Sequence, residues 1–226
     1  MSASDIGYVL ERKERKTLEI SVLPDGKAVV KAPLDASDAI IESFVAKRAA
    51  WIRRQIDYFR DFEPRLQPRH FVPGETHLFL GRRYRLRVLS GAPDVKIEGG
   101  YLVVKTREKS PACVARAIES WQREQAKGVF AALAKKVWSR IGLSAEKHPR
   151  LCVKVLSRRW GSLSASGTLT LNLALIQAPR LCIEYVICHE LCHIEHPGHG
   201  PAFYEKLGRI LPDWKDRKLR LERMLC

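Results

Sequence analysis

The residues with the clearest chemical potential lie near the end of the chain, in the segment HELCHIEHPGH at positions 189–199. On an α-helix, His189 and His193 share one face because they are four residues apart, so both imidazoles can bind one zinc ion. Glu190 can reach the same side, where a carboxylate can accept a proton from a zinc-bound water. The spacing therefore predicts a zinc-dependent hydrolase of peptide bonds, with Glu190 as the general base.

A catalytic zinc ion needs a third protein ligand and one position left open for water. His196 lies about 10.5 Å beyond His189 along a helix, and the proline after it disfavours helical geometry at that position. Gly198 permits a sharp reversal of the chain, after which His199 can return to the metal. We therefore predict that His189, His193 and His199 bind the zinc, with His196 beside the site or on the surface.

These residues require a helix with an apolar opposite face, and the sequence supplies one between Arg180 and His196. Apolar residues recur there at spacings of four, four and three, as Ile183, Ile187, Leu191 and Ile194. Cys188 and Cys192 are alternative ligands on the same helix, but they point to the side of the histidine face, which favours a packing role. A structural zinc site would need a fourth protein ligand and would leave the glutamate without a purpose.

The rest of the chain alternates predicted strands and helices, without internal repeats. In the first part, hydrophobic periodicity and turn signals predict strands over residues 17–22, 28–32, 77–80, 84–89, 95–97 and 101–105, and one helix over 38–59. The second part is predicted to have a helix over 111–141, strands over 151–156 and 169–175, and basic helices over 201–225 with an interruption near Pro212.

This order predicts an α+β fold in which a small antiparallel or mixed sheet accompanies the HExxH helix. The pattern changes near Ser110 and Pro111, where a long helical segment begins. We therefore expect two domains: a smaller α+β region over residues 1–110, a candidate for substrate recognition, and a catalytic domain over residues 111–226.

The chain carries a formal net charge of +15, from 40 Lys and Arg against 25 Asp and Glu. A positive surface attracts nucleic acids or acidic proteins without specifying which. No RNP, zinc-finger or helix-turn-helix signature accompanies the charge. Two interpretations stay open: a solvated basic surface, or a binding surface for nucleic acid or an acidic partner.

The composition is that of a globular protein, with 46% hydrophobic and 29% charged residues. No stretch approaches the ~18 consecutive apolar residues that suggest a membrane helix. The first 20 residues include the charged run at positions 11–16 and lack the apolar core of a signal peptide. We expect a cytoplasmic protein that does not interact with membranes.

The second half of the chain resembles the YgjP-like zinc metallopeptidases, relatives of minimal gluzincin-like and SprT-like zincins. The resemblance rests on residues that share the order and spacing of the family pattern: Arg159 to Ser162, Gly167, Leu171-Asn172, Tyr185-Val186, His189 to His193, His199 and Phe203. It implies a zincin-like α+β catalytic domain with His189, His193 and His199 as zinc ligands and Glu190 as the base. The substrate would be a peptide or protein.

Two other functions are compatible with these features. The chain could be a nucleic-acid-associated module, or a protease that acts on DNA-bound proteins, if the basic charge forms a binding surface. It could also be a zinc-binding regulator without catalytic activity. The presence of Glu190 beside His189 favours the catalytic interpretation.

Overall fold

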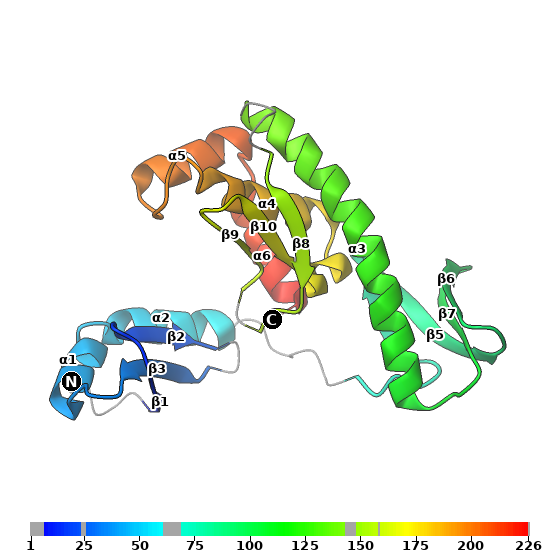
Figure 1. The fold of residues 1–226 in the computed structure, drawn as a ribbon, viewed down its shortest axis with the longest axis horizontal. Coiled ribbons are helices and arrows are strands. Elements are labelled where there is room, and N and C mark those ends of the chain that lie inside the picture. Colours follow the sequence, from blue (N-terminus) through cyan, green and yellow to red (C-terminus); the bar gives the residue numbers. More distant parts are fainter. Residues whose placement is uncertain (1–6, 24–25, 61–68, 143–147, 158, 226) are drawn as a thin grey trace. The chain divides into compact units, whose positions relative to one another are not determined.

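The computed structural model describes residues 7–23, 26–60, 69–142, 148–157 and 159–225. The chain forms two compact units, Met1–Leu66 together with Cys226, and Gln67–Leu225 (Figure 1). Across the described ranges, no helix is both long enough and apolar enough to cross a membrane.

The first unit is a three-stranded sheet with two helices. Its strands are β1 (Tyr8–Lys13), β2 (Glu19–Val22) and β3 (Ala28–Pro33) in the order β1-β3-β2, with β2 antiparallel and β1 parallel to β3. The predicted hairpin is confirmed. The single helix expected over 38–59 is instead two, α1 (Asp38–Ala46) and α2 (Ala49–Arg60), although neither glycine nor proline marks the break. Both helices contribute to one small core of Ala28, Val30, Ala32, Ile41, Val45 and Ile52.

The second unit begins with a four-stranded sheet of β4 (Thr76–Phe79), β5 (Arg82–Ser90), β6 (Asp94–Glu98) and β7 (Tyr101–Thr106). The strand order is β4-β5-β7-β6, and the β5–β7 pair is parallel. One face of this sheet packs on the first turns of the long helix α3 (Pro111–Ile141), through Leu86, Leu102, Val104, Val114 and Ile118. Apolar packing therefore joins the strands before residue 110 to the helix after it. The role of residues 1–110 in substrate recognition stays a prediction.

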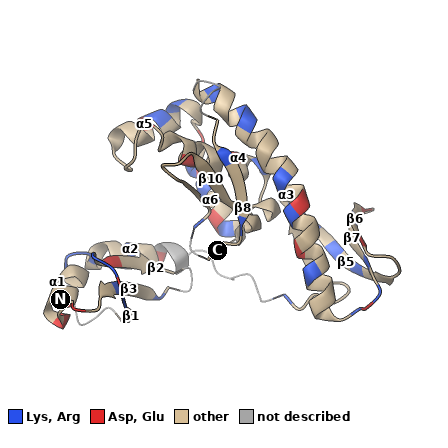
Figure 2. Ribbon diagram, viewed as in Figure 1, with Lys and Arg blue, Asp and Glu red and all other residues tan. Residues whose placement is uncertain are grey.

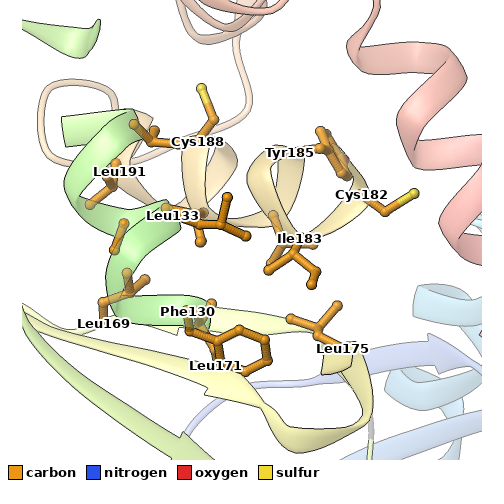
Figure 3. Close-up of a cluster of buried hydrophobic side chains, with 14 of the residues drawn as sticks. Phe130, Leu133, Leu169, Leu171, Leu175, Cys182, Ile183, Tyr185, Cys188 and Leu191 are labelled. Atoms are coloured by element: carbon orange, nitrogen blue, oxygen red, sulfur yellow. The ribbon is translucent and has the colours of Figure 1, made fainter. Parts of the chain in front are cut away.

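The later turns of α3 cover the core that supports the candidate site. Three strands, β8 (Arg150–Lys154), β9 (Gly161–Leu163) and β10 (Thr168–Asn172), form a mixed sheet in the order β8-β10-β9. A 3₁₀ helix, η3 (Leu173–Gln177), leads into α4 (Arg180–Cys192), and α5 (Pro201–Ile210) and α6 (Trp214–Leu225) follow. Figure 3 shows side chains from α3, β10, η3 and α4 packed together, among them Phe130, Leu171, Leu175 and Ile183. The α+β fold class is confirmed.

The strand predicted over 169–175 is wrong in its last part, because Asn172 ends β10 and starts η3. The Asn172 side chain accepts a hydrogen bond from the backbone N–H of Ala174 at 3.1 Å. Its amide nitrogen donates to the carbonyls of Leu156 at 2.8 Å and Arg159 at 3.1 Å. The backbone N–H of Leu156 also donates to the Asn172 side chain at 3.5 Å. A buried asparagine that contacts four backbone groups turns the chain here, although the apolar pattern continues.

Helix α4 is shorter than predicted, since it ends at Cys192 and not at His196. The last predicted residue of its apolar face, Ile194, is 40% exposed, so its assignment to the core is wrong. The earlier residues Ile183, Ile187 and Leu191 are buried as predicted. The chain leaves the helix in the turn that precedes Pro197, where helical geometry is disfavoured.

A buried carboxylate ties α4 to both neighbouring helices. Glu184 is only 2% exposed. It forms ion pairs with Lys136 at 3.1 Å and Arg140 at 3.4 Å from α3, and with Arg217 at 2.7 Å from α6. Burial alone would raise the pKa of Glu184, but these cations hold it below its usual value. The helix that carries the histidines is therefore fixed on two sides by charge as well as by apolar packing.

The start of α4 is supported by the turn between β4 and β5. The backbone N–H groups of Leu80 and Gly81 donate to the carbonyls of Ile176 at 2.8 Å and Gln177 at 2.9 Å. Gly81 has φ +80°, and a Cβ at this position would lie 2.7 Å from Cγ and 3.1 Å from Cα of Pro179. Only glycine permits both this backbone conformation and this approach.

We predict that Gly81→Ala lowers the free energy of unfolding by about 2 kcal/mol or more. The left-handed backbone alone costs alanine roughly 1–2 kcal/mol, and the new methyl group would collide with Pro179. Urea unfolding followed by circular dichroism measures the change. Gly128→Ala is the control, because Gly128 lies in α3 with no atom within 4 Å of the new Cβ. It should stabilise the protein by about 0.5–1 kcal/mol. Equal stability of Gly81→Ala and the parent would contradict this role of the turn.

Candidate metal centre

The last turn of α4 presents His189 and His193 on one face. His193 is the residue after the helix, but its backbone stays helical, with φ −67° and ψ −13°. The four-residue spacing therefore keeps its helical geometry, and the two ring centroids lie 5.2 Å apart. Early termination of α4 does not disturb the predicted pair.

His199 returns to this pair from the segment between α4 and α5. Its Nε2 lies 3.0 Å from Nε2 of His189. The three histidines each offer one ligand atom, and these atoms all lie within 4.8 Å of one another. The structure thus brings together the three histidines that the sequence singled out.

His196 is placed beside this cluster and contributes through its backbone. Its carbonyl oxygen lies 3.0 Å from Nδ1 of His193. If Nδ1 donates to this carbonyl, the proton is fixed there and the lone pair of Nε2 is left free, as in histidines that bind metals. A position next to the site, as predicted for His196, fits this contact.

Phe203 forms the floor on which the three imidazoles are packed. It is fully buried at the start of α5. Its ring centroid lies 5.0 Å from that of His189 and 4.8 Å from those of His193 and His199. The sequence marked Phe203 only through the family resemblance, since apolar periodicity could not show which side chains it would touch.

The environment of His189 and His199 favours the neutral form of both side chains. Burial, followed by the proximity of His199 and His193, lowers the pKa of His189 to about 4. Burial and His193 also lower the pKa of His199. Neutral imidazoles are required for metal binding, so the lowered pKa values of His189 and His199 favour it. The arrangement fits a cation that takes three nitrogen ligands.

The side chain of Glu190, a residue of α4, lies against the edge strand β9. An added Cβ on Gly161 would lie 2.9 Å from Cγ and 3.0 Å from Oε1 of Glu190, so the absence of a side chain makes room for the carboxylate. Burial raises the pKa of Glu190 to about 7, while Arg159 and the backbone N–H of Leu163 favour its ionised form. Gly161, Arg159 and Leu163 were not predicted as partners of Glu190, because they lie far from it in sequence.

Two hollows adjoin the histidines and the glutamate. The larger, about 1050 Å³, runs along β9 and the following turn and includes all three histidines and Glu190. The smaller, about 230 Å³, lies between α4 and α6 and is lined by Trp160, Tyr185, Leu221 and Glu222 in addition to His189 and Glu190. The larger hollow has room for an extended peptide, and the smaller has room for one of its side chains.

The two cysteines that were alternative ligands, and two tyrosines near the histidines, lie outside the cluster. Cys188 and Cys192 are buried in the core, in agreement with the packing interpretation. Tyr185 is buried, which raises the pKa of its phenol, and its ring contacts His189 at 6.0 Å between centroids. Tyr204 is 42% exposed and stacks on Trp214 with ring centroids 5.3 Å apart.

Three imidazoles converging beside a carboxylate on an HExxH helix are typical of metallopeptidases. Residues 16–224 match the family described as YgjP-like, metallopeptidase domain. The chain belongs to this family. It is therefore a peptidase that acts on peptides or proteins, and its family implies a metal cofactor.

Two crystal structures of metallopeptidase zymogens are similar to part of the chain. Jannalysin of Methanocaldococcus jannaschii is 19% identical with a TM-score of 0.39, and the match covers 43% of this chain and 90% of that one. Abylysin of Pyrococcus abyssi is 21% identical with a TM-score of 0.37, covering 41% and 90%. Likenesses at this level carry no functional argument. No curated protein matches the chain.

Proposed function

We propose that the protein is a zinc-dependent peptidase in which His189, His193 and His199 bind the ion and Glu190 acts as the general base. The observation that carries this proposal is the convergence of three imidazole ligand atoms within 4.8 Å of one another. Glu190 supports it because it follows the first of these histidines and lines the same two hollows as that residue. A zinc-binding regulator would not need a carboxyl group at this position.

The three imidazoles fit zinc because three protein ligands and one open position are typical of its catalytic sites. When bound, the ion supplies a Lewis acid that polarises the scissile carbonyl and lowers the pKa values of the attacking water and the neighbouring carboxyl group. The contact between His193 Nδ1 and the His196 carbonyl orients one ligand ring.

Glu190 accepts the proton of the attacking water and returns it to the leaving amine. The backbone N–H of Leu163 and the guanidinium of Arg159 favour the ionised carboxylate that the first step requires.

The edge strand β9 offers a place for an extended substrate. Its partner β10 occupies one side only, since the strand order is β8-β10-β9. Hydrogen bonds from Asn172 N–H to Trp160 C=O and from Ser164 N–H to Thr168 C=O define which groups face β10. By alternation, the backbone groups of Gly161 face the other side, towards the larger hollow. A peptide could add there by main-chain hydrogen bonds, with one side chain in the smaller hollow.

We predict that Glu190→Gln lowers kcat for an unstructured protein substrate by about 10²–10⁴-fold, the usual contribution of a general base. Zinc content, measured by inductively coupled plasma mass spectrometry, should stay at one ion per chain. Glu195→Gln is the matched control, because Glu195 is exposed and paired with Lys206. It should cleave as fast as the parent. Cleavage by Glu190→Gln at the parental rate would contradict the assignment of the base.

Gly161→Ala should lower kcat by about tenfold or more without loss of zinc, because the new Cβ would displace the Glu190 carboxylate and small misplacements of a catalytic group are costly. Steady-state kinetics and zinc analysis measure both effects. Gly128→Ala, which adds the same methyl group where nothing lies within 4 Å, should keep full activity. Full activity of Gly161→Ala would show that the carboxylate does not need its present position.

We further predict that His199→Ala weakens zinc binding far more than His196→Ala. His199 offers a ring nitrogen to the cluster, whereas His196 contacts His193 through its backbone carbonyl, which alanine retains. Competition with a chelator of known zinc affinity measures both variants. A larger loss for His196→Ala would move the third ligand to that residue.

A further inference from the structure

The positive charge of the chain is concentrated outside the first unit. Residues 1–66 contain 12 Lys and Arg against 11 Asp and Glu, whereas residues 67–226 contain 28 against 14. Figure 2 shows part of this excess along β5. The charge is therefore not spread evenly, as it would be if it only kept the chain solvated.

Side chains of β5 alternate between the two faces of the four-stranded sheet, with apolar residues on one face and arginines on the other. Leu86 is buried against α3, with Tyr84 and Val88 packed on the same cluster. The alternate residues Arg83, Arg85 and Arg87 are exposed on the opposite face. None of these three arginines forms an ion pair with a described residue, so their charges are available to a partner.

The neighbouring strands extend this basic face. The register places Arg85 beside Tyr101 and Arg87 beside Val103 of β7, and Val103 beside Lys96 of β6. Lys105 follows on β7. Asp94 and Glu98 are the acidic residues of β6 on this side, and Glu98 forms an ion pair with Lys96 at 3.1 Å. We define the basic sheet face by seven residues: Arg83, Arg85, Arg87, Lys96, Tyr101, Val103 and Lys105.

The basic sheet face also carries a stacking platform. The guanidinium carbon of Arg87 lies 3.8 Å from the centroid of the Tyr101 ring. Val103 is only 4% exposed although it does not belong to the core on the α3 side, so neighbouring side chains on this face cover it. The planar guanidinium and phenol groups of this pair, together with Arg83 and Arg85 beside them, form a flat surface with both charge and π-faces.

We propose that the basic sheet face binds single-stranded nucleic acid. Arginines that recur every second residue are about 6.7 Å apart along a strand, which lets them contact successive phosphates of an extended chain. The Arg87–Tyr101 pair can stack on a base, an interaction that tolerates any sequence. An acidic polypeptide would use the charges but not the platform. The major groove of a duplex admits a helix or a two-stranded ribbon, and a four-stranded face is too wide for it.

The test uses the full-length protein and a fluorescein-labelled single-stranded DNA 20-mer of mixed sequence, followed by anisotropy at several NaCl concentrations. The triple variant Arg83→Ser, Arg85→Ser, Arg87→Ser should bind at least about tenfold more weakly. Its log–log salt dependence should be shallower by about 2, since each lost phosphate contact on a single strand removes about 0.7. Tyr101→Leu should weaken binding by about fivefold or more while leaving the salt dependence unchanged.

The matched control is Lys47→Ser, Arg54→Ser, Lys135→Ser, which removes the same charge from three exposed positions outside the basic sheet face. It should bind within about threefold of the parent. All variants should retain the circular dichroism spectrum and the peptidase activity of the parent. Glu190→Gln should also bind the DNA normally, which separates this proposal from the proposed catalytic mechanism.

Several outcomes would overturn the proposal. Equal weakening by the two triple variants would show that only net charge matters. Equal affinity for a duplex of the same length, or for poly-glutamate, would contradict the choice of a single strand. Absence of measurable binding by the parent at low salt would also refute it.

Discussion

The site depends on one constraint: three imidazoles must meet at a point although only two of them can share a helix face. His189 and His193 meet because helical spacing stacks them, whereas His199 arrives only because the chain reverses between α4 and α5. The 3.0 Å distance between Nε2 of His189 and Nε2 of His199 records that convergence. Everything else near the site serves to hold these rings, and the carboxylate beside them, in fixed positions.

Several unrelated interactions supply this support. Phe203 packs against all three rings, and it is itself fully buried. Glu184 links α4 to α3 and α6 through ion pairs with three cations. The turn at Gly81 packs against Pro179, the residue before α4. Gly161 leaves space for Glu190 on the side of β9. Preorganisation of this kind is what a catalytic group needs if its geometry is to be productive on substrate binding.

Local patterns were sufficient for the parts of the fold that depend on local physics. Pro111–Ile141 could be predicted as a helix because it is rich in Ala, Lys and Arg, which favour helices, and because Gly142 follows its end. The end of β10 could not be predicted, because Asn172 forms hydrogen bonds with Leu156 and Arg159, which are distant in sequence. The histidine cluster was predictable because its spacing carries the geometry. The surroundings of Glu190 could not be predicted, because Gly161, Arg159 and Leu163 approach it only through tertiary packing.

We propose that three imidazole nitrogens from this chain surround one zinc ion. Zinc K-edge X-ray absorption spectroscopy on the protein loaded with one equivalent of zinc measures these ligands. We expect three imidazole nitrogens and one oxygen at about 2.0–2.1 Å. Scattering from sulfur at about 2.3 Å, as Cys188 or Cys192 would give, or a fit with fewer than three imidazoles, would contradict it.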